Sequence, residues 1–183
     1  MPGYRHVSMM NLEEKYRDNC AVCTSPGKTF NLAGMQASNI FISDERRREA
    51  VMRARGHFSL NALSYKATEL AYEHGEEWMR EVICYIDANK TFVTAFLREH
   101  LPFVKATELE GTYLLWLDFR ALGLPKQELE ALMRKKAYLF LDEGYIFGRG
   151  GEGFERLNLA CPRRVLAEAL ERLEKAVLGV YRA

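Results

Sequence analysis

The feature that most constrains the fold is a long stretch of apolar residues at helical spacing in the middle of the chain. It begins after Gly75 and stops before Pro102 in a sequence of 183 residues. The apolar positions are Met79, Val82, Ile83, Ile86, Val93, Phe96 and Leu97. This spacing predicts one long amphipathic helix, and its apolar stripe predicts a core for it to pack against.

Strand and helix patterns alternate on both sides of this helix. Before it, the sequence predicts strands in "NCAVCTSP" and "NIFIS" and helices over residues 44–55 and 61–73. After it, "GTYLLWLDF", "AYLFLDEG" and "ERLNLA" are typical of strands and "PKQELEALMRKKA" of a helix. A last helix is expected from Pro162, with a buried stripe of Leu166, Leu170, Leu173, Val177 and Tyr181. Such an alternation favours packed α+β layers.

Composition indicates an ordinary globular chain and excludes some partners. The 26 basic residues balance the 25 acidic ones, for a net charge of +1, so we expect neither nucleic acid nor an anionic membrane as a partner. No apolar run approaches the roughly 18 residues that a membrane helix needs. The N-terminal residues lack the apolar segment of a signal peptide, so we expect a cytoplasmic protein.

The four cysteines give a weak signal. Cys20 and Cys23 form a C-x-x-C pair, which is compatible with redox chemistry or half of a zinc site, but no second Cys or His pair completes four ligands. We therefore expect no metal. The apolar "CAVC" is more typical of a short buried strand, with its thiols packed as small hydrophobic groups.

Lys28 lies in "CTSPGKTFNLAGMQ", which contains the end of a phosphate-binding loop pattern. The full pattern requires a glycine six residues before the lysine, and Val22 occupies that position. Pro26 also removes a backbone N–H donor that such a loop would use. A nucleotide-binding loop is therefore disfavoured. On these residues alone, an ordinary solvated lysine is the simplest interpretation.

A wider resemblance changes that interpretation. The run "SPGKTFNLAGMQASNIFI" closely resembles the lysine segment of the pyridoxal-phosphate (PLP) carbon-sulfur lyases, the cystathionine beta-lyase group of the class I/II aminotransferase superfamily. Four later stretches resemble the same family in the same order: "YEHGEEW", "EGTYLLWLDFRALGL", "FGRGGEGF" and "RLNLACPR". The resemblance covers essentially the whole chain.

The resemblance implies roles for three residues. Lys28 would be the lysine that binds PLP as a Schiff base and then exchanges a proton with the substrate. Ser25 would contact the PLP phosphate, whereas Gly27 replaces a hydroxyl residue that relatives usually carry and so removes one phosphate contact. Arg156 would bind the substrate α-carboxylate, for which a guanidinium is suited. Strand alternation supports this by placing Arg156 on the face opposite Leu157.

The resemblance also implies a fold and a missing part. Residues 1–75 would be the C-terminal remnant of the large PLP-binding domain, a fragment of its parallel sheet, and residues 76–183 the small α+β C-terminal domain with the interdomain helix. Relatives are about twice as long. The absent half would carry the aromatic ring that stacks on PLP, the aspartate at its ring nitrogen and most of the phosphate contacts. We therefore expect a homo-oligomer, such as a homodimer, or a complementing N-terminal half.

Three functions stay open at this point. The first is a portion of a β-lyase that cleaves cystathionine or a related cysteine conjugate to a thiol, pyruvate and ammonia, inactive without the missing half. Lys28 and Arg156 would serve aminotransfer equally well, so an aminotransferase fragment is the alternative reaction. The second is a catalytically silent remnant that acts as an interaction module. The third is nucleotide binding, which the missing first glycine already disfavours.

Overall fold

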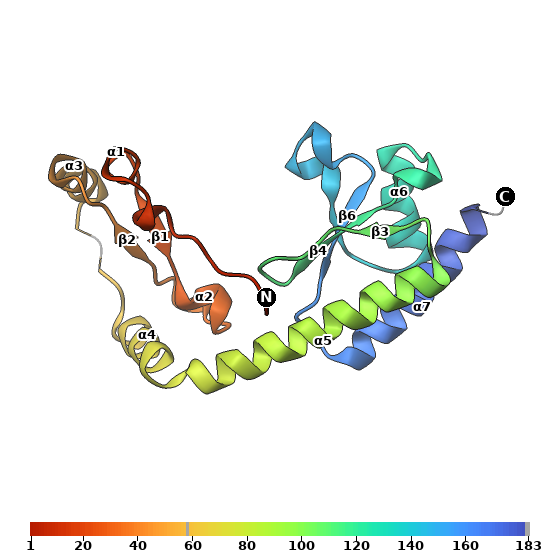
Figure 1. Cartoon of the computed structure of the whole chain (residues 1–183), viewed down its shortest axis with the longest axis horizontal. Coiled ribbons are helices and arrows are strands. Elements are labelled where there is room, and N and C mark those ends of the chain that lie inside the picture. Colours follow the sequence, from red (N-terminus) through yellow and green to blue (C-terminus); the bar gives the residue numbers. More distant parts are fainter. Residues whose placement is uncertain (58, 182–183) are drawn as a thin grey trace. The chain divides into compact units, whose positions relative to one another are not determined.

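The computed structural model describes residues 1–57 and 59–181 (Figure 1). Its contacts divide the chain into two compact units, each described below by itself. The first unit is Arg5–Val82, and the second is Met1–Tyr4 together with Ile83–Ala183. The boundary between the units lies within the long helix α5 (Glu76–His100).

The first unit contains short elements followed by two longer helices. Its strands β1 (Val22–Thr24) and β2 (Asn39–Phe41) pair antiparallel. Parallel neighbours need a crossover of a dozen or more residues, usually a full helix. The residues between β1 and β2 form only single turns. The other elements of this unit are η1 (Met9–Asn11), α1 (Glu14–Arg17), α2 (Pro26–Thr29), η2 (Ala33–Met35), α3 (Glu45–Arg55), α4 (Ala62–His74) and the start of α5.

The ends of α3 and α4 are set by residues that the sequence predicted. Asp44 caps α3 by accepting a hydrogen bond from the Arg47 amide at 2.8 Å, and Gly56 ends the helix at φ 65°. Asn61 caps α4 by accepting from the Ser64 amide at 2.9 Å. His74 is the last residue of α4, as expected from the helix break at Gly75.

The second unit is an antiparallel sheet with helices. The sheet order is β3 (Lys105–Ala106), β4 (Leu114–Asp118), β6 (Phe154–Asn158), β5 (Asp142–Glu143), and every neighbouring pair is antiparallel. Beside it are η3 (Arg120–Leu122), α6 (Lys126–Ala131), η5 (Gly144–Phe147), η6 (Arg149–Gly151) and α7 (Arg163–Tyr181). The predicted helix after Pro125 ends in a π-helical turn, η4 (Leu132–Lys136), and the strand expected over "AYLFLDEG" is reduced to two residues.

The core of the described chain lies almost entirely in the second unit. Apart from Pro26, Ala37 and Ile42, every buried apolar side chain of the described residues belongs to it. Helices α5 and α7 lie alongside each other there (Figure 1), joined by a hydrogen bond between His100 Nδ1 and Glu174 Oε1 at 3.1 Å. The α7 stripe is buried as predicted from Leu166 to Val177, but Tyr181, at the helix end, is exposed although one face of its ring stacks on Phe103. No helix in the described part of the chain is long and apolar enough to cross a membrane.

Many apolar side chains of the first unit are exposed to solvent. Cys23 in β1 is exposed and Cys20 partly so, which corrects the expectation of buried thiols. The reason is that a two-stranded sheet has no second layer of this unit packed over the strand. Large apolar side chains are exposed on most of its elements: Met9, Tyr16, Ile40, Phe41, Val51, Met52, Leu63, Tyr65, Leu70, Tyr72 and Trp78. An apolar surface of this kind is typical of one that another part of a protein covers.

Candidate functional site

Lys28 lies in a tight turn that directly follows a strand. β1 ends at Thr24, Ser25 is in an extended conformation, and the single helical turn α2 begins at Pro26. Proline suits this first helical position because its fixed φ is helical and its missing N–H has no partner to lose. The Lys28 side chain is exposed, and it takes part in none of the ion pairs found within residues 1–57 and 59–181.

Ser25 holds this turn together. Its Oγ donates a hydrogen bond to the Ala37 carbonyl at 2.6 Å and accepts one from the Gly27 amide at 3.0 Å. The Gly27 position is buried, and a Cβ there would lie 3.3 Å from Ala33 Cα, which is a tight contact. Contacts on both sides therefore fix the shape of the turn, and Lys28 is one of its exposed residues.

Helix α4 and the start of α5 hold the lysine segment in place. The Phe30 ring packs edge-on against Tyr72 at 6.3 Å between centroids, and it lies at a tilt of 31° against Trp78 at 6.1 Å. Gly75 lets Phe30 approach, because a Cβ on Gly75 would lie 2.5 Å from Phe30 Cε1. Ser64, fully buried, donates to the Met35 carbonyl at 2.6 Å. These contacts explain why "YEHGEEW" accompanies the lysine motif.

Arg156, in the second unit, is held in a cross-strand row. On β6 it lies between Trp116 of β4 and Asp142 of β5, as the strand register requires. Its Nε and Nη2 donate to Asp142 Oδ2 at 3.1 and 2.7 Å, and its guanidinium carbon lies 4.3 Å from the centroid of the Phe147 ring. The predicted alternation is confirmed, since Leu157 and Leu159 on the opposite face are buried.

A hollow of about 360 Å³ opens beside Arg156. Its wall is formed by Leu139, Phe140, Leu141, Asp142, Arg156, Leu157, Asn158, Cys161, Val165, Leu166 and Ala169. Apolar side chains dominate this wall, and the charges come from one arginine and one aspartate. Such a surface can accept a small ligand that carries a carboxylate and an apolar part.

A group of ionisable side chains beside Arg156 was missed from the sequence. Glu155 is only 2% exposed, and its Oε2 has no hydrogen-bond partner in the described part of the chain. Burial, together with the nearby charges of Glu143 and Glu130, raises the pKa of Glu155 to about 7. Arg134 lies between Glu143 and Glu130. Its Nε is 2.7 Å from Glu143 Oε1, and its Nη1 is 3.2 Å from Glu130 Oε1. Strand alternation could have revealed Glu155, because it shares the face of Leu157.

Asn89 is a second residue that the sequence did not single out. It is completely buried on α5, and its Nδ2 donates to the carbonyls of Leu159 at 2.8 Å and Cys161 at 3.0 Å. Its Oδ1 accepts from Arg163 Nε at 2.7 Å. Asn89 thereby fixes the segment that leads from β6 into α7. The signal was present, because Asn89 interrupts an otherwise apolar helical stripe between Ile86 and Val93.

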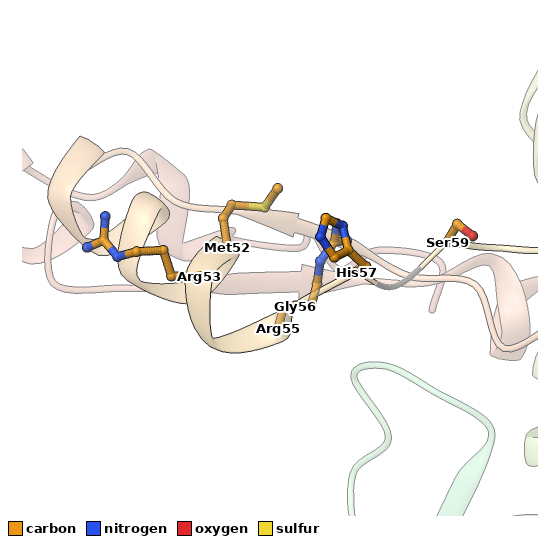
Figure 2. A pocket seen from close by; sticks show the side chains of 6 residues that line it. All are labelled: Met52, Arg53, Arg55, Gly56, His57 and Ser59. Carbon is orange, nitrogen blue, oxygen red and sulfur yellow. The ribbon is translucent and has the colours of Figure 1, made fainter.

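The predicted site residues fall into two groups. The structure brings Lys28 and Ser25 together in one turn of the first unit, whereas Arg156 belongs to the second unit. A larger hollow, of about 570 Å³, lies at the C-terminal end of α3 and contains none of them. Figure 2 shows its lining side chains, Met52, Arg53, Arg55, Gly56, His57 and Ser59. All of these are exposed, so the hollow is an open surface feature with no buried polar group to recognise a ligand.

Comparison with known proteins agrees with the resemblance to carbon-sulfur lyases that the sequence motifs indicate. Cystathionine beta-lyase PatB of Bacillus subtilis (strain 168) is 40% identical over 178 residues, which are 96% of this chain and 46% of that protein. Protein MalY of Escherichia coli (strain K12) is 29% identical over 182 residues, 97% of this chain and 44% of that protein. The chain thus spans slightly less than half the length of the curated relatives that it matches.

Solved structures give the same result. Cystalysin from Treponema denticola, whose crystal structure contains pyridoxal 5'-phosphate, is 44% identical, with a TM-score of 0.94 over 98% of this chain and 46% of that one. A PLP-bound putative aminotransferase from Clostridium difficile 630 is 37% identical, with a TM-score of 0.92 over 97% of this chain. The described elements therefore have the fold of the corresponding part of a PLP-dependent aminotransferase. Residues 4–173 match the family described as aminotransferase class I and II, and the chain belongs to this family.

Proposed function

We propose that this chain is the C-terminal portion of a PLP-dependent β-lyase that acts on cystathionine or a related cysteine conjugate. The observation that carries the proposal is the likeness, over almost the whole chain, to cystathionine beta-lyase PatB and to cystalysin. The products would be a thiol, pyruvate and ammonia. Residues 1–75 would then be the remnant of the large domain, and residues 76–183 the small domain.

Each proposed site residue has a geometry that supports its role. Lys28 Nζ would hold PLP, and the exposure of this side chain on a rigid turn supports that assignment. PLP would supply an electron sink for the bond broken at the substrate α-carbon. When the lysine amine is free, it can take the α-proton and return a proton elsewhere. Arg156 would bind the α-carboxylate in the hollow beside β6.

The residues present fit covalent attachment of PLP better than they fit its phosphate. The Ser25 hydroxyl already donates to the Ala37 carbonyl, and the Gly27 amide already donates to Ser25 Oγ. Ser25 would have to exchange its bond to Ala37 for one to the phosphate. Most phosphate contacts would come from the part of the enzyme that this chain does not span.

The exposed apolar surface of the first unit supports an assembly. We propose that an N-terminal half of the same enzyme family covers it, and that the resulting enzyme is a homo-oligomer, as is typical of this family. All four cysteines are free, which is the usual state in the reducing cytoplasm and supports the cytoplasmic location that we propose.

Aminotransfer is the second candidate reaction, favoured by the likeness to the Clostridium difficile aminotransferase. A catalytically silent remnant that acts as an interaction module is the third candidate. The three differ in what an assembled enzyme would produce: pyruvate from cystathionine alone, an amino acid from an added 2-oxo acid, or nothing.

The proposal is tested by complementation. The chain is co-expressed with the N-terminal half of the Bacillus subtilis relative, and the complex is assayed with cystathionine for pyruvate and thiol. We expect activity with the wild-type chain and none with Lys28→Ala. Lys66→Ala removes an exposed lysine of the same unit, paired with Glu69, and serves as the control. A stable complex that holds PLP but releases neither pyruvate nor a thiol from cystathionine would contradict the proposal, and an amino acid formed from an added 2-oxo acid by that complex would support aminotransfer instead.

A further inference from the structure

The Arg156 guanidinium is occupied on two of its sides by residues of its own unit. Asp142 takes the edge formed by Nε and Nη2, at 3.1 and 2.7 Å from a single oxygen, Oδ2. The Phe147 ring covers one face of the guanidinium at 4.3 Å. The Trp116 ring in turn packs on Phe147 at 5.3 Å between centroids.

These contacts leave one edge of the guanidinium available. Arginine has five N–H donors, and Asp142 uses one on Nε and one on Nη2. The remaining donors are both hydrogens of Nη1 and one of Nη2, which form the edge that can grip a carboxylate with two parallel bonds. Arg156 and Asp142 line the same hollow, so a ligand there would meet the guanidinium already oriented.

We propose that Asp142 is a positioning residue, which holds Arg156 in the orientation that receives a substrate carboxylate. The inference rests on the proposed role of Arg156 and adds to it a residue that the family motifs do not name. The physical reason is that a free arginine side chain must lose rotational freedom when it binds, and Asp142 with Phe147 removes that freedom in advance.

If Asp142 had the opposite role, its removal would change the affinity for a carboxylate in the opposite direction, so the two roles can be told apart. If Asp142 acted as a competitor, its negative charge would repel the incoming carboxylate, and its removal would tighten binding. The relative exposure of the two side chains favours positioning. Asp142 is 49% exposed, so water screens its repulsion of a ligand, whereas Arg156 is only 24% exposed and is held in one place.

The test follows the Nε–Hε signal of Arg156 by NMR in the full chain, with the signal assigned by its loss in Arg156→Lys. Acetate is titrated at constant ionic strength, and acetamide is the neutral control probe. We expect acetate to perturb the wild-type signal. We expect Asp142→Ala to weaken acetate binding by about 2- to 5-fold and Asp142→Asn, which keeps an acceptor in place, by less. The Nε–Hε order parameter should also fall in Asp142→Ala.

A matched control uses a similar pair elsewhere in the unit. Asp118 binds Arg120 Nε at 2.9 Å and Nη2 at 2.7 Å, so Asp118→Asn alters the same kind of contact away from the Arg156 pair. It should leave acetate binding at Arg156 unchanged. Equal or tighter binding in both Asp142 variants would overturn the inference while the carboxylate role of Arg156 stands. Failure of acetate to perturb wild-type Arg156 would overturn both.

Discussion

Phe30, two residues after Lys28, packs directly against the backbone of Gly75 at the junction of α4 and α5. A methyl group on Gly75 would lie 2.5 Å from Phe30 Cε1 and would also overlap the Ala71 carbonyl. The lysine turn and the glycine of "YEHGEEW" are therefore two sides of one contact. The order of the motifs along the chain reflects packing within the first unit.

Gly75→Ala should destabilise the first unit, because neither the Phe30 ring nor the Ala71 carbonyl can give way without repacking. We expect a loss of about 1–3 kcal/mol in the free energy of unfolding. Gly34→Ala is the control, since a Cβ at Gly34 meets no atom within 4 Å. Urea unfolding followed by tryptophan fluorescence, in a Trp116→Phe background so that Trp78 alone reports, measures the difference. Equal stability of the two variants would show that the Phe30 contact does not constrain this junction.

Gly144→Ala should disrupt the glycine-rich turn that places the Phe147 ring against the Arg156 guanidinium. A Cβ on Gly144 would lie 2.6 Å from the Phe154 carbonyl and would overlap the Gly151 carbonyl, and backbone atoms cannot move aside cheaply. We expect a loss of about 2–4 kcal/mol. The near-UV circular dichroism of Trp116, which packs on Phe147, should change with it. Gly150→Ala, in open space within the same run, should alter neither property.

Asn89→Ala should destabilise the second unit by about 2–4 kcal/mol, because the carbonyls of Leu159 and Cys161 lose their donor. Asn89→Asp tests the cause, since a carboxylate keeps the contact with Arg163 but cannot donate to either carbonyl. Both variants should be less stable than Thr94→Ala on the same helix in a denaturant titration. Wild-type stability of Asn89→Asp would show that the two donated bonds contribute little.

Glu155 makes the stability of the second unit depend on pH. Its pKa is raised from 4.5 to about 7, so the folded chain binds more protons than the unfolded chain between these values. This contribution is therefore fully present below pH 4.5 and is lost as the pH rises to about 7. Its size is about 3 kcal/mol, from roughly 1.4 kcal/mol per pKa unit.

Glu155→Gln should abolish that part of the pH dependence. The free energy of unfolding is measured for both proteins from pH 4 to pH 8. As the pH rises, the wild type should lose stability relative to the variant. Glu152→Gln, at an exposed position three residues earlier, is the control and should give a nearly flat difference. A flat difference for Glu155→Gln as well would mean that folding does not raise the pKa of Glu155.

Much of the fold followed from local pattern. Helix boundaries at Asp44, Gly56 and Asn61 were predictable because caps satisfy backbone groups within a few residues. The exposure of Cys23 was not predictable, because it depends on what covers a sheet rather than on the sequence of one strand. The π-helical turn after Ala131 also left no local signal.

The candidate site shows the same division. Alternation along β6 placed Arg156 opposite Leu157, and family motifs singled out Lys28 and Ser25. Alternation did not reveal Asp142, because its significance arises only from the pairing of β5 with β6, fourteen residues apart in sequence. Glu155 and Asn89 were overlooked although each polar residue lies on an apolar face. Such a position is a usable signal for a buried polar group with a structural or electrostatic role.

The proposed function depends most directly on whether Lys28 is the residue that binds PLP. The chain, assembled with the N-terminal half of a relative, is incubated with PLP, reduced with borohydride and analysed by peptide mass spectrometry. We predict one reduced adduct, on the peptide that contains Lys28. This adduct should be absent from Lys28→Ala and retained in Lys66→Ala. An assembled, folded complex that gives no adduct, or adducts on other lysines that persist in Lys28→Ala, would contradict this prediction.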